Sequence, residues 1–264
     1  MAYQLICQGI PYAVAAGVVY AGTSFVRALA NDKHIHDCRF GKCTSARLPA
    51  GPNFFVNKDG LQIFWRRWFP KGNKPKGIVV LCHGMAEHSG RYETFASFLT
   101  AAGFAVYALD HQGHGASEGD RVHIQKFDDF TQDVLQFTNI VKERHPELRN
   151  SFFLIGHSMG ALISIHTALA NLGQWAGVVL SGAPLKPDPK VASPFLIAVA
   201  HFLSNILPKL PLDKLPPDGL CTDKAVVQNY RAYIECVCSF VFLKSGIDGP
   251  LIPLKYSSKT NFLT

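Results

Sequence analysis

The residues whose types and spacing indicate chemistry form the pentapeptide Gly156-His157-Ser158-Met159-Gly160. An apolar run, residues 152–155, leads into it and a helix-forming run follows, which places the serine at a sharp turn between a buried strand and a helix. Glycine is needed on both sides because a Cβ atom there would clash inside such a turn. A serine at this helix N-terminus lies beside the Met159 backbone N–H, which can stabilise a developing oxyanion. The pattern predicts that Ser158 is a nucleophile, and the alternative interpretation is an ordinary strand-to-helix turn.

A serine hydroxyl is a weak nucleophile and needs a general base beside it. After a Gly-x-Ser-x-Gly turn, the acid and then the histidine of the triad follow the serine along the chain. In this sequence the histidines after Ser158 are His166 and His201. His166 would lie about two turns along the helix, too far to reach the hydroxyl. His201 has only Asp188 as an acid between it and the serine, and this pair has no geometric support, so the residues indicate a nucleophile without its base.

The elements that must hold Ser158 alternate between strands and helices from residue 53 onward. A Lys58-Asp59-Gly60 turn precedes an early antiparallel strand, and continuous apolar runs then predict strands buried on both faces. The expected strands cover residues 61–69, 77–82, 104–109, 152–155 and 177–181, and the expected helices cover residues 92–102, 127–144 and the run after Ser158. Repeated strand–helix–strand units require a parallel sheet with right-handed crossovers. We therefore expect an α/β fold class with a mostly parallel, doubly wound sheet.

Motifs on these elements resemble those of the α/β-hydrolases. The motifs, in chain order, are His83-Gly84 after a buried strand, Asp110-x-x-Gly113-x-Gly115-x-Ser117 and the serine pentapeptide. The longer stretches 83–92 and 113–119 are similar to the monoacylglycerol lipase and lysophospholipase branch. The similarity covers about residues 52–231, with a core at 52–185. The resemblance implies an α/β-hydrolase fold with a helical lid insertion.

The same resemblance implies an activity and roles within the site. It indicates a serine ester hydrolase that cleaves monoacylglycerol or lysophospholipid through an acyl-enzyme at Ser158, with no cofactor and no metal. The backbone N–H groups of Met85 and Met159 would form the oxyanion hole. The residues expected to contact substrate are Gly84, His157, Leu185, Phe195 and Leu203.

In this family the histidines beside the serine are not bases. His83 and His157 are expected to support the loops of the site through hydrogen bonds, and Asp110 resembles a structural turn aspartate outside the triad. Family members carry the acid and the base after two further strands, for which these 264 residues offer no match. The resemblance is lost from about residue 232. Residues 232–264 are therefore expected to be a divergent tail of a C-terminally truncated, marginally stable and catalytically impaired chain with an open edge strand.

A proline-rich insertion, residues 186–231, follows the core. Within it, Pro194 can open a helix over residues 195–207 that is apolar almost all round. Its polar side chains fall on one narrow stripe and are His201, Ser204 and Asn205. The resemblance implies a lid over the acyl-binding site, whose apolar helix would dock on lipid. The alternative interpretation is a core helix.

The first residues differ from the α/β region that follows. Residues 1–26 carry no charged side chain, and the run 10–26 is at the short edge of what can span a bilayer. The lack of a basic N-terminal region disfavours a cleavable signal peptide, whereas positive charge downstream would keep the catalytic part cytoplasmic. Residues 1–45 are interpreted either as a membrane anchor or as an unstructured extension.

The net charge of +7 is unevenly distributed along the chain. Residues 27–91 hold twelve Lys and Arg side chains against four Asp and Glu, so the basic excess lies in the N-terminal third. No basic and aromatic surface of the kind that binds nucleic acid accompanies it, and such charge favours an anionic membrane surface as the partner. The alternative is an ordinary solvated face.

Length and composition give the remaining bounds. A chain of 264 residues that is 48% hydrophobic can bury one sizeable core. The seven cysteines are odd in number, and the spacing Cys236-x-Cys238 is too short for the usual zinc knuckle. A reducing compartment is the simpler inference, so we expect a cytoplasmic, membrane-associated protein.

Overall fold

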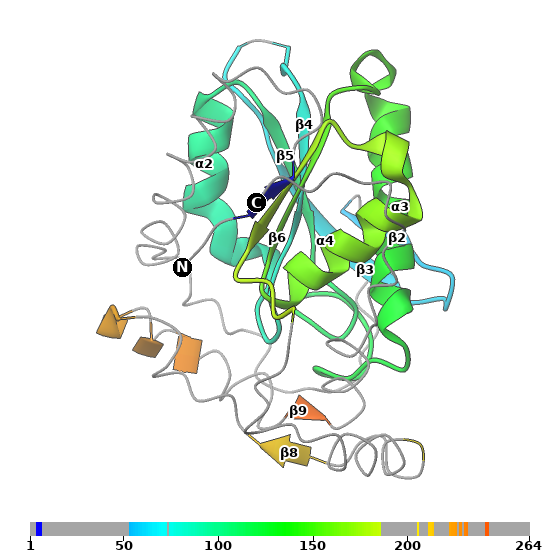
Figure 1. Cartoon of the computed structure of the whole chain (residues 1–264), viewed down its shortest axis with the longest axis vertical. Coiled ribbons are helices and arrows are strands. Elements are labelled where there is room, and N and C mark those ends of the chain that lie inside the picture. Colours follow the sequence, from blue (N-terminus) through cyan, green and yellow to red (C-terminus); the bar gives the residue numbers. More distant parts are fainter. Residues whose placement is uncertain are drawn as a thin grey trace.

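An open β-sheet with helices on both faces follows the predicted alternation of elements (Figure 1). The computed structural model describes residues 4–6, 53–72, 74–185, 205, 211–213, 222–225, 227–228, 230–231 and 241–242. Within that part of the chain, seven strands form the sheet in the order β1-β7-β6-β4-β5-β3-β2. The strands are β1 Gln4–Ile6, β2 Phe54–Val56, β3 Gln62–Trp68, β4 Ile78–Cys82, β5 Ala105–Leu109, β6 Phe152–His157 and β7 Gly177–Ser181.

The strand directions confirm the predicted α/β architecture. The central pairs β4–β5, β4–β6 and β6–β7 are parallel, while β3 runs antiparallel to β5 and β2 runs antiparallel to β3. Residues 4–6, expected to lie in an anchor or extension, form β1 and pair antiparallel with β7, where Leu5 lies opposite Val179. β1 binds backbone N–H and C=O groups that β7 would otherwise leave free, so β1 rather than β7 is the edge strand of the described sheet.

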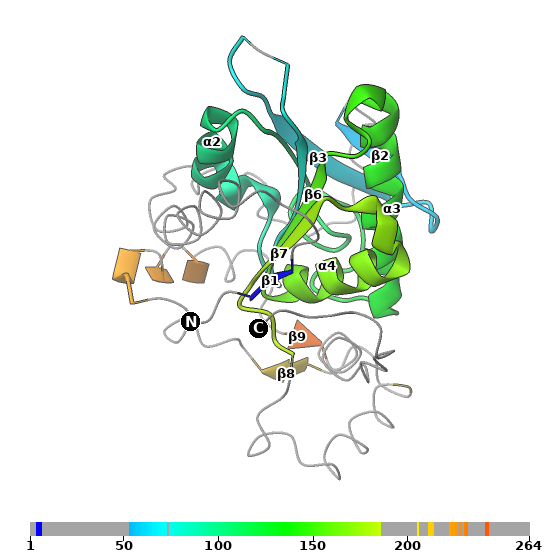
Figure 2. The same cartoon turned by 45° about the horizontal axis from the view of Figure 1, so that its top comes forward.

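Helices cover the two faces of the sheet unequally (Figures 1 and 2). Helix α2, Glu93–Ala101, lies on one face, and helices α3, Phe127–Arg144, and α4, Met159–Ala170, lie on the other. The short 3₁₀ helices are η2 Ser89–Tyr92, η3 Pro146–Leu148 and η4 Leu172–Gln174. Two further strands, β8 Pro211–Asp213 and β9 Val241–Phe242, form a separate antiparallel pair.

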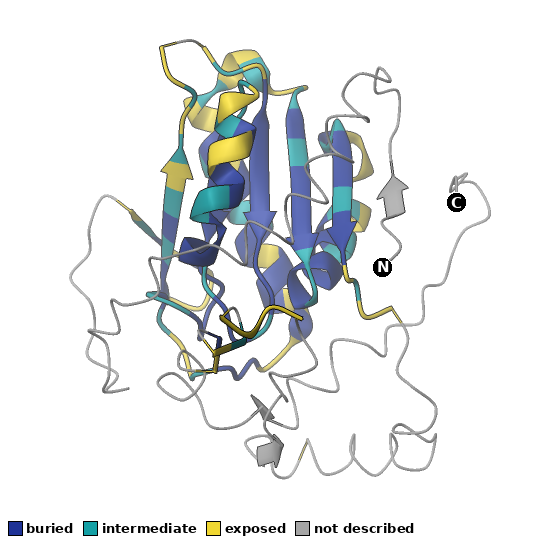
Figure 3. Ribbon diagram, turned by 90° about the vertical axis from the view of Figure 1, so that its left-hand side faces the viewer, coloured by how far each residue is buried: buried dark blue, intermediate teal, exposed yellow. Residues whose placement is uncertain are grey.

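The burial of the strands explains the sequence patterns that predicted them (Figure 3). Every residue of β4 and β5 is buried, so both strands must be unbroken apolar runs. Strand β3, near the side of the sheet, mixes buried and partly exposed residues. Between the sheet and α3, the rings of Tyr107 and Phe137 are fully buried and pack edge to face. Burying an aromatic ring of this size contributes about 2–3 kcal/mol, which anchors α3 and the loop before it.

Several expectations lie outside the described residues. They are the apolar run 10–26, most of the insertion 186–231 with Phe195 and Leu203, and most of the tail 232–264. In the part of the chain that the structure describes, no helix is both long and apolar enough to cross a membrane.

Candidate active site

Ser158 lies at the junction between β6 and α4, as the pentapeptide predicts. Its backbone has φ 53° and ψ −119°, a left-handed conformation that residues other than glycine rarely adopt. The Ser158 N–H donates to the Ser181 carbonyl oxygen at 2.8 Å, and the Ser158 carbonyl oxygen accepts from the Ala161 N–H at 2.9 Å. The first bond fixes the turn to β7 and the second starts the helix. Strain of this kind persists only where the surrounding structure over-determines it, as at many functional sites.

The two glycines of the pentapeptide allow two elements to meet at the turn. A Cβ atom on Gly160 would collide with the carbonyl oxygens of Cys82 and His83, at the end of β4. A Cβ atom on Gly156 would collide with the Gly160 carbonyl oxygen and the Ser164 side chain. The prediction that both flanking positions must lack a Cβ is therefore confirmed. The close approach also brings the chain that follows His83 directly beside the serine turn.

His83 supports this neighbouring loop. Its Nδ1 lies 2.8 Å from the Gly84 carbonyl oxygen, and its Nε2 accepts from the His111 backbone N–H at 3.0 Å. This pair of bonds fits a neutral ring that donates from Nδ1. Burial lowers the pKa of His83, and attraction to Asp110 offsets only part of that shift. The expectation that His83 holds a loop through hydrogen bonds is confirmed.

Glu87 is buried and contacts several residues of the loop after β4, a role that its sequence motif did not predict. One carboxylate oxygen accepts from the Gly84 N–H at 3.1 Å and from the Tyr92 hydroxyl at 2.8 Å, and the other lies 3.9 Å from Arg91 Nε. Burial raises the pKa of Glu87, but His157, Arg91 and the Tyr92 hydroxyl lower it by more, so the net shift is downward. The available signal was the one acidic residue of the stretch 83–92, five residues before Tyr92 and four before Arg91.

Asp110 is a structural residue, as the resemblance implied. Its carboxylate accepts from the Ser89 N–H at 2.7 Å, from the Ser89 hydroxyl and from the Ala116 N–H at 2.8 Å. Burial raises its pKa, but His88, His83 and Arg66 lower it by more, so the carboxylate stays charged. Asp110 thus joins the loops after β4 and β5.

The described histidines near the serine make contacts with groups other than the Ser158 hydroxyl. His157 Nδ1 lies 3.2 Å from Ser181 Oγ, consistent with the expected supporting role. His166 packs its ring edge to face against Phe127, with centroids 5.4 Å apart, so it is directed toward α3. Within the described residues no histidine forms a hydrogen bond with the Ser158 hydroxyl. His201 and Asp188 lie outside those residues.

The other predicted site residues divide into those that the structure places and those that it does not describe. Gly84 lies against the serine turn, because a Cβ atom there would be 3.4 Å from the His157 carbonyl oxygen. Met159 begins α4 directly after Ser158, and Met85 follows Gly84 in the supporting loop. Leu185 is exposed after β7. The roles of these residues toward substrate stay predictions.

Comparison with known proteins adds an independent line of evidence. The family model described as "Serine aminopeptidase, S33" matches residues 73–240. The chain is 40% identical to the monoglyceride lipase of Homo sapiens over 177 residues, which are 67% of this chain and 57% of that protein. It is 39% identical to the monoacylglycerol lipase of Mycolicibacterium smegmatis over 178 residues, 67% of this chain and 62% of that protein. The chain thus spans about three fifths of the length of these curated relatives.

Solved structures of monoacylglycerol lipases also resemble this chain. The Paleococcus ferrophilus monoacylglycerol lipase superposes with a TM-score of 0.58 at 34% identity, covering 70% of this chain and 68% of that one. A soluble variant of the monoglyceride lipase of Saccharomyces cerevisiae gives a TM-score of 0.60 at 21% identity, covering 78% of this chain and 68% of that one, which supports the fold alone.

Proposed function

Because the chain belongs to the α/β-hydrolase family, in its monoacylglycerol lipase branch, we propose that it is a serine ester hydrolase acting on monoacylglycerol. The observation that carries the proposal is Ser158, held in a left-handed conformation between β6 and α4 beside the loop of Gly84. A strained serine at this position is the arrangement that exposes a nucleophile at the end of an α/β-hydrolase sheet. A lysophospholipid, which carries the same single acyl ester, is the alternative substrate.

The proposed reaction has two steps. Ser158 Oγ bonds to the acyl carbonyl carbon while its proton passes to a general base, and the carbonyl oxygen becomes an oxyanion held by the Met85 and Met159 N–H groups. The intermediate collapses, the ester C–O bond breaks and glycerol leaves with that proton. Water then attacks the acyl-enzyme through the same base, releasing a fatty acid and restoring the serine hydroxyl.

A second proposal concerns the 264-residue chain by itself. We propose that this chain binds acylglycerol but turns it over weakly, because His166 packs against Phe127 and no described histidine reaches Ser158. Without a base beside the serine, only binding and the oxyanion hole accelerate the reaction, by about 10³–10⁴-fold over water in serine proteases that lack triad members.

Turnover and labelling of the purified chain test both proposals. Glycerol release from monoacylglycerol is measured beside the labelling of Ser158 by a fluorophosphonate, with Ser158→Ala as the blank. Slow, Ser158-dependent release and labelling would support both proposals. Release that Ser158→Ala does not change would contradict the nucleophile. Rapid Ser158-dependent turnover would contradict the weak-turnover proposal, and His201→Ala would then test whether His201 is the base.

We also propose that the protein associates with membranes from the cytoplasmic side, since residues 1–26 are uncharged and the basic excess follows them. Sedimentation with phosphatidylserine vesicles, with and without residues 1–42, tests this. Release on removal of residues 1–42 would support an anchor there, and weaker binding at high salt would support the charge contribution. Unchanged sedimentation without these residues would contradict the anchor.

A further inference from the structure

We propose that Tyr230 is a positioning residue for the candidate oxyanion hole, holding the Met85 backbone in place through its hydroxyl group. The inference rests on the proposed function, because the orientation of the Met85 N–H matters to catalysis only if an oxyanion forms beside Ser158. Tyr230 lies 145 residues from Met85 along the chain, and sequence reasoning gave it no role.

The contact is specific and buried. The Tyr230 hydroxyl donates to the Met85 carbonyl oxygen at 3.2 Å, and Tyr230 is only 5% exposed. The Arg91 guanidinium carbon lies 5.3 Å from the centre of the Tyr230 ring, within the range of a cation–π contact. Arg91 is also the residue that neighbours Glu87, so the ring and the carboxylate that hold the loop share one cation.

The loop that Tyr230 contacts needs such support. Ala86, directly after Met85, has φ 54°, and Val122 has φ 53°, although neither is glycine. Left-handed backbone is unfavourable for both, most of all for a β-branched residue, and it persists only where neighbours over-determine it. Tyr230 forms one buried cluster with these two residues. Its ring therefore belongs to the buried cluster that contains both strained positions.

The hydrogen bonds act on the two sides of Met85. Glu87 holds the Gly84 N–H in the His83–Gly84 peptide, and Tyr230 holds the Met85 carbonyl oxygen in the Met85–Ala86 peptide. The peptide between them contains the Met85 N–H, and His83 Nδ1 holds its Gly84 carbonyl oxygen. With the peptide on each side fixed, Met85 has little freedom to turn its own N–H. Oxyanion stabilisation depends on donors that are already oriented when charge develops. Loss of the Tyr230 hydroxyl would release the Met85–Ala86 peptide and leave the strained Ala86 free to relax, so the Met85 N–H would be held from the preceding peptides only.

The experiment compares Tyr230→Phe with Tyr107→Phe in the 264-residue chain. Both remove one hydroxyl from a buried ring, and the Tyr107 hydroxyl bonds His145 Nε2 at 2.8 Å, away from the serine loops. Two quantities are measured: hydrogen exchange of the backbone amides of residues 84–87, and the rate of Ser158 acylation or phosphonylation. We expect Tyr230→Phe to speed exchange and to slow the reaction about five- to tenfold, the worth of one hydrogen bond, with KM unchanged. Tyr107→Phe should change neither.

Each outcome decides the proposal. Unchanged exchange at residues 84–87 in Tyr230→Phe would overturn it, whatever the reaction rate. Faster exchange with an unchanged reaction rate would overturn the positioning role, and equal effects in Tyr107→Phe would reduce it to general stability. If the unsubstituted chain shows no Ser158-dependent reaction, the proposed function of this chain fails separately. Hydrogen exchange alone then tests the positioning role, and a selective increase in the exchange rate of residues 84–87 in Tyr230→Phe would support it.

Discussion

The loops beside Ser158 and the polar network at the start of α3 bury titratable side chains in opposite ways. The buried groups of the loops that follow β4 and β5 include histidines held neutral: burial lowers the pKa of His88 to about 4 and that of His114 to about 3. At the start of α3 the buried group is an acid, Asp133, whose pKa burial raises to about 7. Low pH therefore destabilises the folded form of the first region, and rising pH destabilises that of the second.

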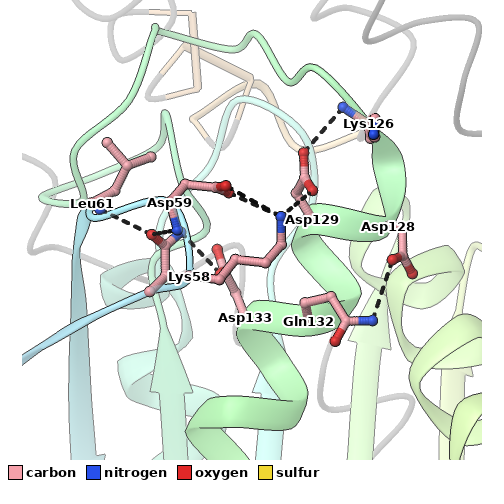
Figure 4. A network of polar contacts seen from close by, with 9 residues as sticks. Lys58, Asp59, Leu61, Lys126, Asp128, Asp129, Gln132 and Asp133 are labelled. Atoms are coloured by element: carbon pink, nitrogen blue, oxygen red, sulfur yellow. Dashed lines mark hydrogen bonds and ion pairs between the residues drawn. The ribbon is translucent and has the colours of Figure 1, made fainter.

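The network at α3 is a short chain of polar contacts between the turn before β3 and the helix (Figure 4). Asn57 Nδ2 donates to Asp133 Oδ1 at 3.0 Å, and Lys58 Nζ donates to Asp129 Oδ1 at 2.7 Å. Asp129 also accepts from the Lys126 N–H at 3.2 Å, which caps the helix. Asp133 Oδ2 is buried without a hydrogen-bond partner among the described residues, the condition under which a carboxyl group stays protonated.

Buried polar side chains have different roles in the two regions. Around the serine, neutral rings and ionised carboxylates such as Asp110 bind backbone N–H and C=O groups, so they fix the path of loops that carry the site. The α3 network joins a surface turn to a helix and touches no predicted site residue. Changes in the first region should alter the geometry of the site, whereas changes in the second should alter stability alone.

The largest expected effect is that of Gly160→Ala. Its Cβ would meet the Cys82 and His83 carbonyl oxygens, whose backbone cannot retreat without moving β4. We expect a loss of about 4 kcal/mol in the free energy of unfolding, at the upper end for single substitutions. Urea denaturation measures it, with Gly173→Ala as the control because nothing lies within 4 Å of a Cβ there. Equal effects of the two substitutions would show that the serine turn does not press against β4.

The next largest effect is the loss of stability at low pH that the buried His114 causes, and His114→Gln tests it. Burial holds the pKa of His114 near 3, with His83 adding to the shift, so the unfolded chain binds a proton below pH 6.5 that the folded chain does not. Stability should be full above pH 6.5 and fall by about 3 kcal/mol toward pH 4 through this one group. His114→Gln should remove about one proton from the slope of unfolding free energy against pH. A slope that stays the same would contradict a neutral buried His114.

The fold was largely predictable because its signals are local. Continuous apolar runs predicted β4 and β5, and the residues expected for α3, 127–144, match the helix as it is. The glycines beside Ser158 likewise predicted a sharp turn, in which Ser158 has φ 53°. These features depend on backbone conformation and burial, which nearby residues determine.

The supports of the site were less predictable because they join distant residues. Tyr230 meets Met85 across 145 positions, and β1 pairs with β7 from the far end of the chain. Ala86 adopts a left-handed conformation where glycine would be expected. No local pattern encodes such contacts, since each depends on the packing of segments that only the folded chain brings together.

A smaller effect is expected for Asp133→Asn, and its dependence on pH is opposite in sign to that of His114. The folded pKa of Asp133, about 7, lies above the ordinary value of 3.8, so its contribution to stability is present below pH 3.8 and is lost as pH rises toward 7. Asparagine keeps the shape and cannot ionise. We therefore expect Asp133→Asn to be about 2 kcal/mol more stable than the unsubstituted chain at pH 8, with little gain at pH 4.

A contrast within the same network sharpens this test. Lys58→Ala removes an ion pair whose lysine side chain is 46% exposed, and solvent screening limits its worth to about 0.5 kcal/mol. Urea denaturation at pH 4 and pH 8 should therefore give a pH-dependent gain for Asp133→Asn and a small, nearly constant loss for Lys58→Ala. A loss of stability in Asp133→Asn at pH 8 would mean that the ionised carboxylate is stabilising. The contrast between the two regions would then fail, because low pH would destabilise both of them.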